Sequence, residues 1–285
     1  MSGERTFKQE LTGVFGFPVA ENPTQAMIEP AYRALGLDWR YLTVEVRPEG
    51  LRDAVFGARA MGWKGFNLTI PHKVAVLEYL DRLSPAAEAI GAVNCVVIRD
   101  GRLIGDNTDG KGFVESLRAI RPIEHARIVI LGAGGASRAI AVESAFAGAA
   151  HVSIVGRTFS KAEDLAEAVR SKSLVDAAAI PWRGAFRIPN GTDILVQATS
   201  IGLYPDLDAE VPIESASLDP KTTVCDVIPN PPRTRLLRLA AEKGCATLDG
   251  LGMLVNQGVI GVRLWTGRDP DPNVMRRSLE EIFSS

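Results

Sequence analysis

The sequence predicts an α/β protein with two domains, each built from strands that alternate with helices. Its 285 residues exceed the usual size of one hydrophobic core, so two domains are the natural expectation. The apolar and charged fractions, 46% and 23%, are ordinary for a globular protein. Strand-like and helix-like segments follow one another along nearly the whole chain, which is typical of sheets with buried parallel strands.

The first part of the chain predicts a domain with a mixed sheet. Apolar periodicity and turn residues predict strands at 11–16, 41–46 and 65–70 and helices at 24–36, 49–61 and 73–80. The segment 93–106 predicts a hairpin, because Asp100-Gly101 is a strong two-residue turn signal. A hairpin adds antiparallel strands to the others, so we expect a mixed sheet.

The second part of the chain predicts a doubly wound parallel sheet. Its first strand, RIVILG, is apolar without alternation, as expected when both faces are buried. Further strands are predicted at 151–156, 193–196 and 222–227, and helices at 136–147, 160–171, 233–243, 251–266 and 273–283. We therefore expect domains at 1–110 and 111–250, with the helices of 251–285 packing back toward the first domain.

Charge and hydropathy exclude several classes of protein. The net charge is −2 and the basic residues are scattered, whereas nucleic-acid and membrane surfaces need a concentrated basic patch. No apolar run approaches the ~20 residues of a membrane span, and MSGERTFKQE lacks the apolar region of a signal peptide. Cys95, Cys225 and Cys245 are too widely spaced for a zinc site or a disulfide framework. We expect a cytoplasmic monomer or homodimer that binds a small molecule and no nucleic acid, membrane or metal.

A glycine-rich loop, GAGGAS, joins the first strand of the second domain to a helix. Gly132 permits a tight turn, and Gly134 lets the backbone approach a pyrophosphate at the positive end of the helix. Ser137 stands where the strict fingerprint has a third glycine. A packing turn without a ligand is the alternative, but the strand–loop–helix context favours a Rossmann-type dinucleotide-binding domain.

The end of the next strand predicts which dinucleotide is bound. An NAD enzyme usually places an acid here for the ribose 2′-hydroxyl, but no acid appears before Glu163. Arg157, Thr158 and Lys161 offer a guanidinium, a hydroxyl and an ammonium, which suit the 2′-phosphate of NADP. Thr158 or Ser160 could also cap the following helix, and the two roles are compatible.

Two segments of the first domain carry side chains suited to catalysis. In NLTIPHK, Asn67 and Thr69 alternate along a predicted strand and would share one face, and Lys73 follows the strand end. The polar loop GDNTDG, which contains Asp109, lies just before the domain boundary, where ligand sites are common. Taken alone, Lys73 could be a surface lysine and Asp109 a helix N-cap. His72 is expected to be a supporting or surface histidine.

With these motifs the chain resembles the shikimate dehydrogenase family nearly from end to end. The NxTxPxK and GDNTDG elements are highly specific in combination. The resemblance implies hydride transfer between shikimate C3 and the nicotinamide C4 of NADP, in the pathway to aromatic amino acids. The matching stretches are GFP (16–18), GFNLTIPHK (65–73), GAVNC (91–95), GDNTDG (105–110), GAGGASR (132–138), GRTFSK (156–161), QATSIG (197–202) and DGLGMLVNQG (249–258).

The resemblance also implies the roles of single residues. Lys73 and Asp109 correspond to the catalytic lysine and aspartate, and carbonyl reduction needs a proton donor at the developing alkoxide. The residues implied to hold the substrate are Asn22, Thr24, Asn67, Thr69, Asn94 and Gln257. Those implied to contact the cofactor are Gly132, Gly134, Gly135, Ala136, Ser137, Arg157, Thr158, Lys161, Thr199, Ser200, Gly202 and Val227.

The chain departs from the family where the substrate carboxylate is held. Members usually carry Ser-x-Ser-Pro after the first strand, whereas here Asn22 and Thr24 stand at the serine positions and Glu21 replaces a frequent histidine. Pro229 stands where a tyrosine is common. Asn22 could merely cap the next helix, with Glu21 in solvent. A quinate/shikimate or amino-shikimate dehydrogenase therefore stays open, as does a silent NADP-binding sensor, although the intact catalytic pair argues against the sensor.

Overall fold

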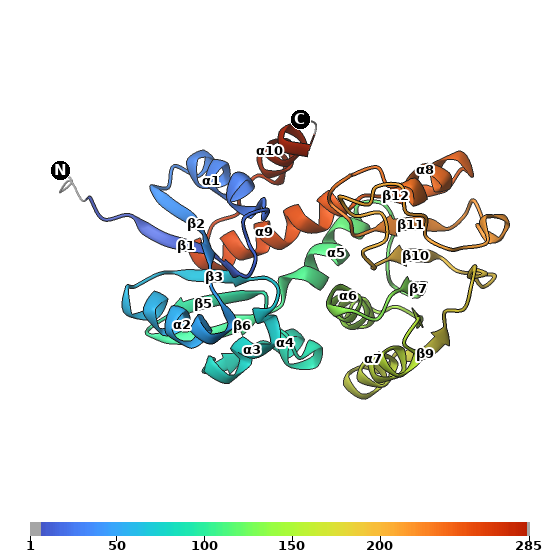
Figure 1. Cartoon of the computed structure of the whole chain (residues 1–285), viewed down its shortest axis with the longest axis horizontal. Coiled ribbons are helices and arrows are strands. Elements are labelled where there is room, and N and C mark those ends of the chain that lie inside the picture. Colours follow the sequence, from blue (N-terminus) through green and yellow to red (C-terminus); the bar gives the residue numbers. More distant parts are fainter. Residues whose placement is uncertain (1–6, 284–285) are drawn as a thin grey trace. The chain divides into compact units, whose positions relative to one another are not determined.

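The computed structural model describes residues 7–283, which form two compact units (Figure 1). Unit 1 comprises the described residues up to 87, with 91–106 and 258–279, and unit 2 comprises 88–90, 107–257 and the described residues from 280 onward. Each unit contains one six-stranded sheet, the first mixed and the second parallel. The predicted fold class, α/β with a mixed sheet followed by a doubly wound sheet, is confirmed. The predicted domain limits, at 110 and 250, stay predictions.

The sheet of unit 1 has the strand order β2-β1-β3-β5-β6-β4. The strands β1, β2 and β3 pair in parallel, and β5 pairs antiparallel to both β3 and β6. The predicted hairpin is confirmed, with Asp100 and Gly101 at φ 51° and 73° in its turn. The strands are β1 (Glu10–Gly16), β2 (Trp39–Glu45), β3 (Gly65–Leu68), β4 (Arg82–Leu83), β5 (Cys95–Arg99) and β6 (Arg102–Asp106).

The helices of unit 1 cover this sheet and differ from the predictions at two places. The predicted helix 73–80 is a short α-helix followed by a 3₁₀ turn, Val76–Tyr79. The sequence patterns also missed α4, which begins at the N-cap Ser84 and ends at the left-handed Gly91. The helices are α1 (Thr24–Ala34), α2 (Leu51–Ala60), α3 (His72–Ala75), α4 (Pro85–Ile90, across the unit limit), the second half of α9 (Gly250–Thr266) and α10 (Pro272–Phe283).

An aromatic core fixes the sheet of unit 1. The rings of Phe15 and Phe66 stack with centroids 4.6 Å apart, and Trp63 lies 5.7 Å from Phe15. The indole N–H of Trp265, on α9, donates to the carbonyl of Val96 at 3.0 Å, which ties that helix to β5.

The sheet of unit 2 has the strand order β12-β11-β10-β7-β8-β9 and is parallel throughout. The order reverses between β7 and β10, and in such sheets ligands bind beyond the carboxyl ends of the strands at the reversal. Sequence patterns missed β9, β12 and α5. The elements are α5 (Thr108–Arg118), β7 (Arg127–Leu131), α6 (Gly135–Phe146), β8 (His151–Gly156), α7 (Phe159–Lys172), β9 (Asp176–Pro181), β10 (Ile194–Gln197), β11 (Thr223–Asp226), α8 (Arg235–Glu242) and β12 (Ala246–Leu248).

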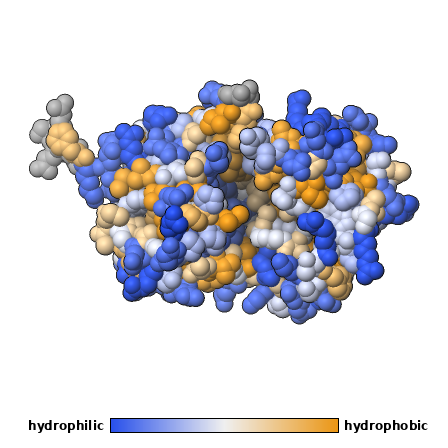
Figure 2. All heavy atoms as spheres, in the orientation of Figure 1, coloured by the Kyte–Doolittle hydropathy of each residue, from blue (hydrophilic) through white to orange (hydrophobic). Residues whose placement is uncertain are grey.

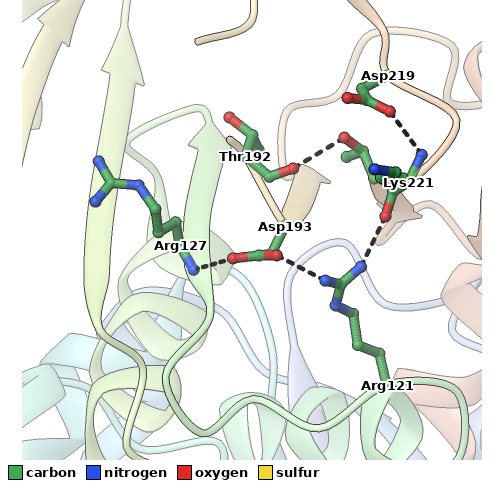
Figure 3. A network of polar contacts seen from close by, with 7 residues as sticks. Arg121, Arg127, Thr192, Asp193, Asp219 and Lys221 are labelled. Carbon is green, nitrogen blue, oxygen red and sulfur yellow. Dashed lines mark hydrogen bonds and ion pairs between the residues drawn. The ribbon is translucent and has the colours of Figure 1, made fainter. Parts of the chain in front are cut away.

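A polar network closes the amino-terminal edge of this second sheet (Figure 3). The carboxylate of Asp193 accepts from the guanidinium of Arg121 at 2.6 Å and from the backbone N–H of Arg127 at 2.9 Å. Arg121 also donates to the carbonyl of Lys221 at 2.8 Å. The chain segments that enter β7, β10 and β11 are therefore held together at the edge opposite the carboxyl ends of the strands.

Hydrophilic and hydrophobic side chains alternate over the face shown in Figure 2. Within residues 7–283, no helix is both long enough and apolar enough to cross a bilayer.

Candidate functional site

Asn67 lies near the carboxyl end of β3 with its amide held by two neighbours. Its Nδ2 donates to the carbonyl of Asn94 at 2.9 Å, and its Oδ1 accepts from the hydroxyl of Tyr41 at 2.7 Å. The backbone N–H of Leu68 donates to the same Asn94 carbonyl. Asn67 and Asn94 are thus brought together, both nearly fully buried.

Thr69 is not part of the strand, because β3 ends at Leu68 rather than at residue 70. The predicted strand 65–70 is therefore two residues too long, and the role of Thr69 toward the substrate stays a prediction. The chain turns there through a cis Ile70-Pro71 bond, and the backbone N–H of His72 donates to the Thr69 carbonyl. The backbone N–H of Thr69 still donates to the carbonyl of Phe15, so the residue stays beside the end of β1.

Lys73 stands in the first turn of α3, directly after this loop. It is partly exposed, and its carbonyl accepts from the backbone N–H of Val93 at 2.8 Å, which fixes the helix beside the loop before Asn94. His72 is buried, and its Nε2 lies 2.7 Å from the carbonyl of Val46. Because a carbonyl only accepts, Nε2 carries a proton, and His72 is a supporting residue rather than a surface one.

The loop before α1 uses its polar side chains locally. The Oδ1 of Asn22 accepts from the backbone N–H of Thr24 at 3.0 Å, at the start of the helix. Thr24 is buried and Glu21 is exposed. Asn22 therefore closes a local turn just before α1, whose N-cap is Pro23 without a side-chain capping bond, so the predicted cap is not formed. Glu21 lies in solvent, as one of the two sequence interpretations expected.

Asp109 lies in the first turn of α5 in unit 2. The N-cap of this helix is Asn107, whose Oδ1 accepts from the backbone N–H of Asp109 at 3.2 Å. Asp109 is therefore not the cap, and it lies in the first turn of the helix, at its positive end. Gln257, on α9, lies against the same helix, since a Cβ on Gly112 would come within 2.6 Å of the Gln257 nitrogen.

The glycine-rich loop lies between β7 and α6, at the reversal of strand order. Gly132 has φ 115°, and a Cβ there would come within 2.9 Å of the Ala198 carbonyl, so the fold itself requires this glycine. Gly134 and Gly135 are exposed, and a Cβ on either would meet no atom of the protein. Packing therefore does not explain these two glycines, and the sequence prediction that a pyrophosphate approaches the backbone here stays open.

Ser137 explains the departure from the glycine fingerprint. Its side chain is fully buried, and its hydroxyl lies 3.4 Å from the carbonyl of Ala198, which follows β10. The residue therefore links the first turn of α6 to the neighbouring strand. Ala136 lies beside it in the first helical turn.

Arg157, Thr158 and Lys161 follow β8 and are exposed. The two basic side chains among them give α7 a cationic start. Arg157 comes directly after the strand, and Lys161 lies in the first turn of the helix. Thr158 occupies the N-cap position, but its side chain makes no capping hydrogen bond. Its hydroxyl is thus not used by the helix, which fits the interpretation that these groups receive a phosphate.

The loop after β10 is held by Gln197, a residue that the sequence patterns did not single out. This fully buried side chain accepts from the backbone N–H of Thr199 and donates to the carbonyl of Ile201 at 3.0 Å. Ser200 is exposed, and Gly202 has φ 88°, which favours glycine. The signal that the sequence offered was an amide residue directly after the predicted strand 193–196.

Asp226 is the second missed residue, at the carboxyl end of β11. It is 2% exposed and accepts from the backbone N–H of Ile228 at 3.0 Å and from the hydroxyl of Thr234 at 2.7 Å. Burial raises the pKa of this carboxyl to about 6, against the lowering effect of the two hydrogen bonds. The backbone N–H of Val227, on the same turn, donates to the Gln197 carbonyl at 3.1 Å.

Unit 2 therefore offers the parts of a dinucleotide site along one sheet edge. Unit 1 presents amides and a lysine at the ends of its own strands. Among residues 7–283, no cluster of three His, Cys, Asp or Glu side chains is placed to hold a metal ion.

Three family models match the chain. The substrate binding domain of shikimate dehydrogenase matches residues 14–96. The model named shikimate / quinate 5-dehydrogenase matches 115–204, and the C-terminal domain of shikimate 5′-dehydrogenase matches 250–280.

Individual relatives cover almost the whole chain. The NADP⁺-dependent shikimate dehydrogenase of Desulforamulus reducens is 40% identical over 279 residues, which is 96% of each chain. The structure of the shikimate 5-dehydrogenase from Thermus thermophilus with NADP(H) and shikimate is 36% identical, with a TM-score of 0.84, covering 96% of this chain and 99% of the other. The ligand-free 5-ketofructose reductase of Gluconobacter sp. strain CHM43 is 57% identical, with a TM-score of 0.95, covering 98% and 100%.

Proposed function

Since the chain belongs to the shikimate dehydrogenase family, we propose that it catalyses the reversible, NADP-dependent reduction of a ketone such as 3-dehydroshikimate to its secondary alcohol. The chain is an NADP-dependent oxidoreductase that acts on a CH–OH group. The observation that carries the proposal is the pair Gly134 and Gly135, whose missing side chains no protein contact explains.

The residues that would hold NADP are divided along the sheet edge of unit 2. The loop 132–137 would hold the pyrophosphate by backbone N–H groups, and Arg157, Thr158 and Lys161 would hold the 2′-phosphate. Thr199, Ser200, Gly202 and Val227 would line the nicotinamide side. The cofactor, when bound, supplies or accepts the hydride.

We assign the proton transfer to Lys73 and Asp109. An ammonium group at Lys73 would give a proton to the ketone oxygen during reduction and take it back during oxidation. The carboxylate of Asp109, in the first turn of α5, would be the second group of this pair. Thr69, Asn94, Gln257 and Asn67 would orient the substrate by hydrogen bonds.

A neutral polyhydroxy ketone is the second candidate substrate. The relative at 57% identity is named a 5-ketofructose reductase, and 5-ketofructose has no carboxylate. In this chain Asn22 and Thr24 stand in place of two serines, and Pro229 offers no side-chain donor. Both observations fall where the family usually holds a carboxylate, and together they favour the neutral ketone.

The first test is oxidation of NADPH, followed by its absorbance, with 3-dehydroshikimate and with 5-ketofructose. Turnover of either ketone supports the reaction type, and the faster one identifies the substrate class. An absence of turnover with both ketones, in a protein that binds NADPH, would favour the sensor hypothesis instead.

We further propose that the protein acts in the cytoplasm as a monomer or homodimer, without nucleic acid. Its net charge of −2 and scattered basic residues support the absence of nucleic-acid binding. Light scattering of the purified protein would give the mass against the 30.6 kDa of one chain.

A further inference from the structure

The orientation of the Asn67 amide is determined by the chemistry of its two partners. The carbonyl of Asn94 can only accept, so the atom 2.9 Å from it is Nδ2. The Oδ1 then faces the hydroxyl of Tyr41 at 2.7 Å, and this hydroxyl must donate. The opposite orientation would place two acceptors, Oδ1 and the Asn94 carbonyl, against each other.

Tyr41 is itself fixed as a donor. It lies on β2 with no exposed surface, and its ring centroid is 6.1 Å from that of Trp265. Burial, with smaller contributions from Tyr32 and Cys95, raises the pKa of the Tyr41 hydroxyl well above its ordinary value. The hydroxyl therefore keeps its proton throughout the pH range in which an enzyme works.

After these two bonds, the Asn67 amide has one N–H left to donate. We propose that Tyr41 is a positioning residue that holds Asn67 so that this N–H is presented to an oxygen atom of the substrate. The inference rests on the proposed function, in which Asn67 contacts the substrate. It also defines a specificity: a hydroxyl or carbonyl oxygen can accept this bond, whereas an ammonium group cannot.

The variant Tyr41→Phe tests this, because it removes only the hydroxyl and keeps the ring against Trp265. The KM for the ketone, either 3-dehydroshikimate or 5-ketofructose, is expected to rise about tenfold, since one hydrogen bond loses its orientation. The KM for NADPH is expected to stay within about twofold, because the cofactor site lies in the other unit.

The matched control is Tyr32→Phe. Tyr32 is equally buried in unit 1, and its hydroxyl bonds the hydroxyl of Thr12 at 2.8 Å, whereas that of Tyr41 bonds Asn67. If Tyr41 acts only through stability, both variants should lower the melting temperature and leave the ratio of the two KM values unchanged. That result would overturn the positioning role.

A double-variant cycle separates this inference from the proposed function. Asn67→Ala should raise the KM for the ketone, and Tyr41→Phe should add no further increase in that background. If Asn67→Ala leaves kinetics unchanged, the role of Asn67 itself is wrong. If Asn67→Ala raises the KM for the ketone but Tyr41→Phe leaves it unchanged, only the inference about Tyr41 is wrong. The same holds if the increases in KM from the two single variants add in the double variant.

A measurement on the unaltered protein covers the case in which Tyr41→Phe does not fold. The side-chain N–H resonances of Asn67, identified by their loss in Asn67→Ala, should shift when the ketone binds in the presence of NADP⁺. Unchanged resonances under saturating ketone would overturn the inference.

Discussion

The carboxylate of Asp226 accepts a hydrogen bond from the hydroxyl of Thr234, eight positions further along the chain, at 2.7 Å. This bond ties the end of β11 to the N-cap of α8, where the Thr234 hydroxyl also accepts from the backbone N–H of Leu237. The turn between them carries Val227 and Pro229, so a buried ionisable group holds one side of the proposed cofactor site.

The raised pKa of Asp226 predicts a pH dependence of stability. The folded carboxyl titrates at about 6, and an unfolded one at about 3.9. Between these values the folded state keeps a proton that the unfolded state has released, so the free energy of unfolding falls as pH rises from about 4 to about 6. A shift of about two pKa units corresponds to a change on the order of 3 kcal/mol.

Asp226→Asn checks this, because an amide still has an acceptor for Ile228 and a donor for Thr234. Urea unfolding at pH 4 to 7 should show the variant gaining stability over the unaltered protein as pH rises. Asp219→Asn, which changes an exposed carboxylate, is the control. Parallel pH curves for Asp226→Asn and the unaltered protein would contradict the prediction.

Lys73→Ala is predicted to lower kcat by about 10²–10⁴-fold, the usual contribution of a general acid–base group. The dissociation constant of NADP⁺ should stay the same, since Lys73 belongs to unit 1. Lys64→Ala is the control, because Lys64 precedes β3 at its other end and pairs with Glu10. Turnover at the original rate in Lys73→Ala would show that another group transfers the proton.

Arg157→Ala is predicted to weaken NADP⁺ far more than NAD⁺. A charge-assisted bond to the 2′-phosphate is worth about 1.5–3 kcal/mol, and NAD⁺ has no such phosphate. Calorimetric titration with both cofactors measures the difference. Arg170→Ala, at the other end of α7, should change neither affinity. Equal losses for both cofactors in Arg157→Ala would exclude a role at the 2′-phosphate.

Arg121→Ala is predicted to lower the free energy of unfolding by about 1–2 kcal/mol without changing KM. It removes bonds to Asp193 and to the Lys221 carbonyl, and the pair is about one-third exposed, which limits the effect. Arg118→Ala, whose partner Glu115 is more exposed, should change stability by less than about 0.5 kcal/mol. Urea unfolding checks both variants, and equal losses would show that the network adds nothing.

Much of this fold was predictable because the strands of unit 2 are continuous apolar runs and its turns carry glycine. Elements that are short or polar could not be predicted from the sequence. The strand β9 has the sequence DAAAIP, which has no β-branched run, and β12 has three residues. The helix α5 begins within the motif GDNTDG, whose glycines and asparagine favour turns. Its capping by Asn107 became visible only in the structure.

The residues of the candidate site that belong to a sequence motif could be predicted. The buried polar residues that position them could not. The glycine loop and the cationic start of α7 were found from residue type and spacing. Gln197, Tyr41 and Asp226 were not found, because their roles depend on burial and on which polar groups the fold places against them. No periodicity or spacing in one sequence identifies which buried hydroxyl faces which amide.

The most direct test of the account is steady-state kinetics with 5-ketofructose and 3-dehydroshikimate, for the unaltered protein and for Asn22→Ser/Thr24→Ser/Pro229→Tyr. We predict that the unaltered protein has the lower KM for 5-ketofructose. The triple variant should improve KM for 3-dehydroshikimate by about 10- to 150-fold, the worth of one restored bond to a charged group. A low KM for 3-dehydroshikimate in the unaltered protein, unimproved in the triple variant, would contradict the neutral substrate and leave a plain shikimate dehydrogenase.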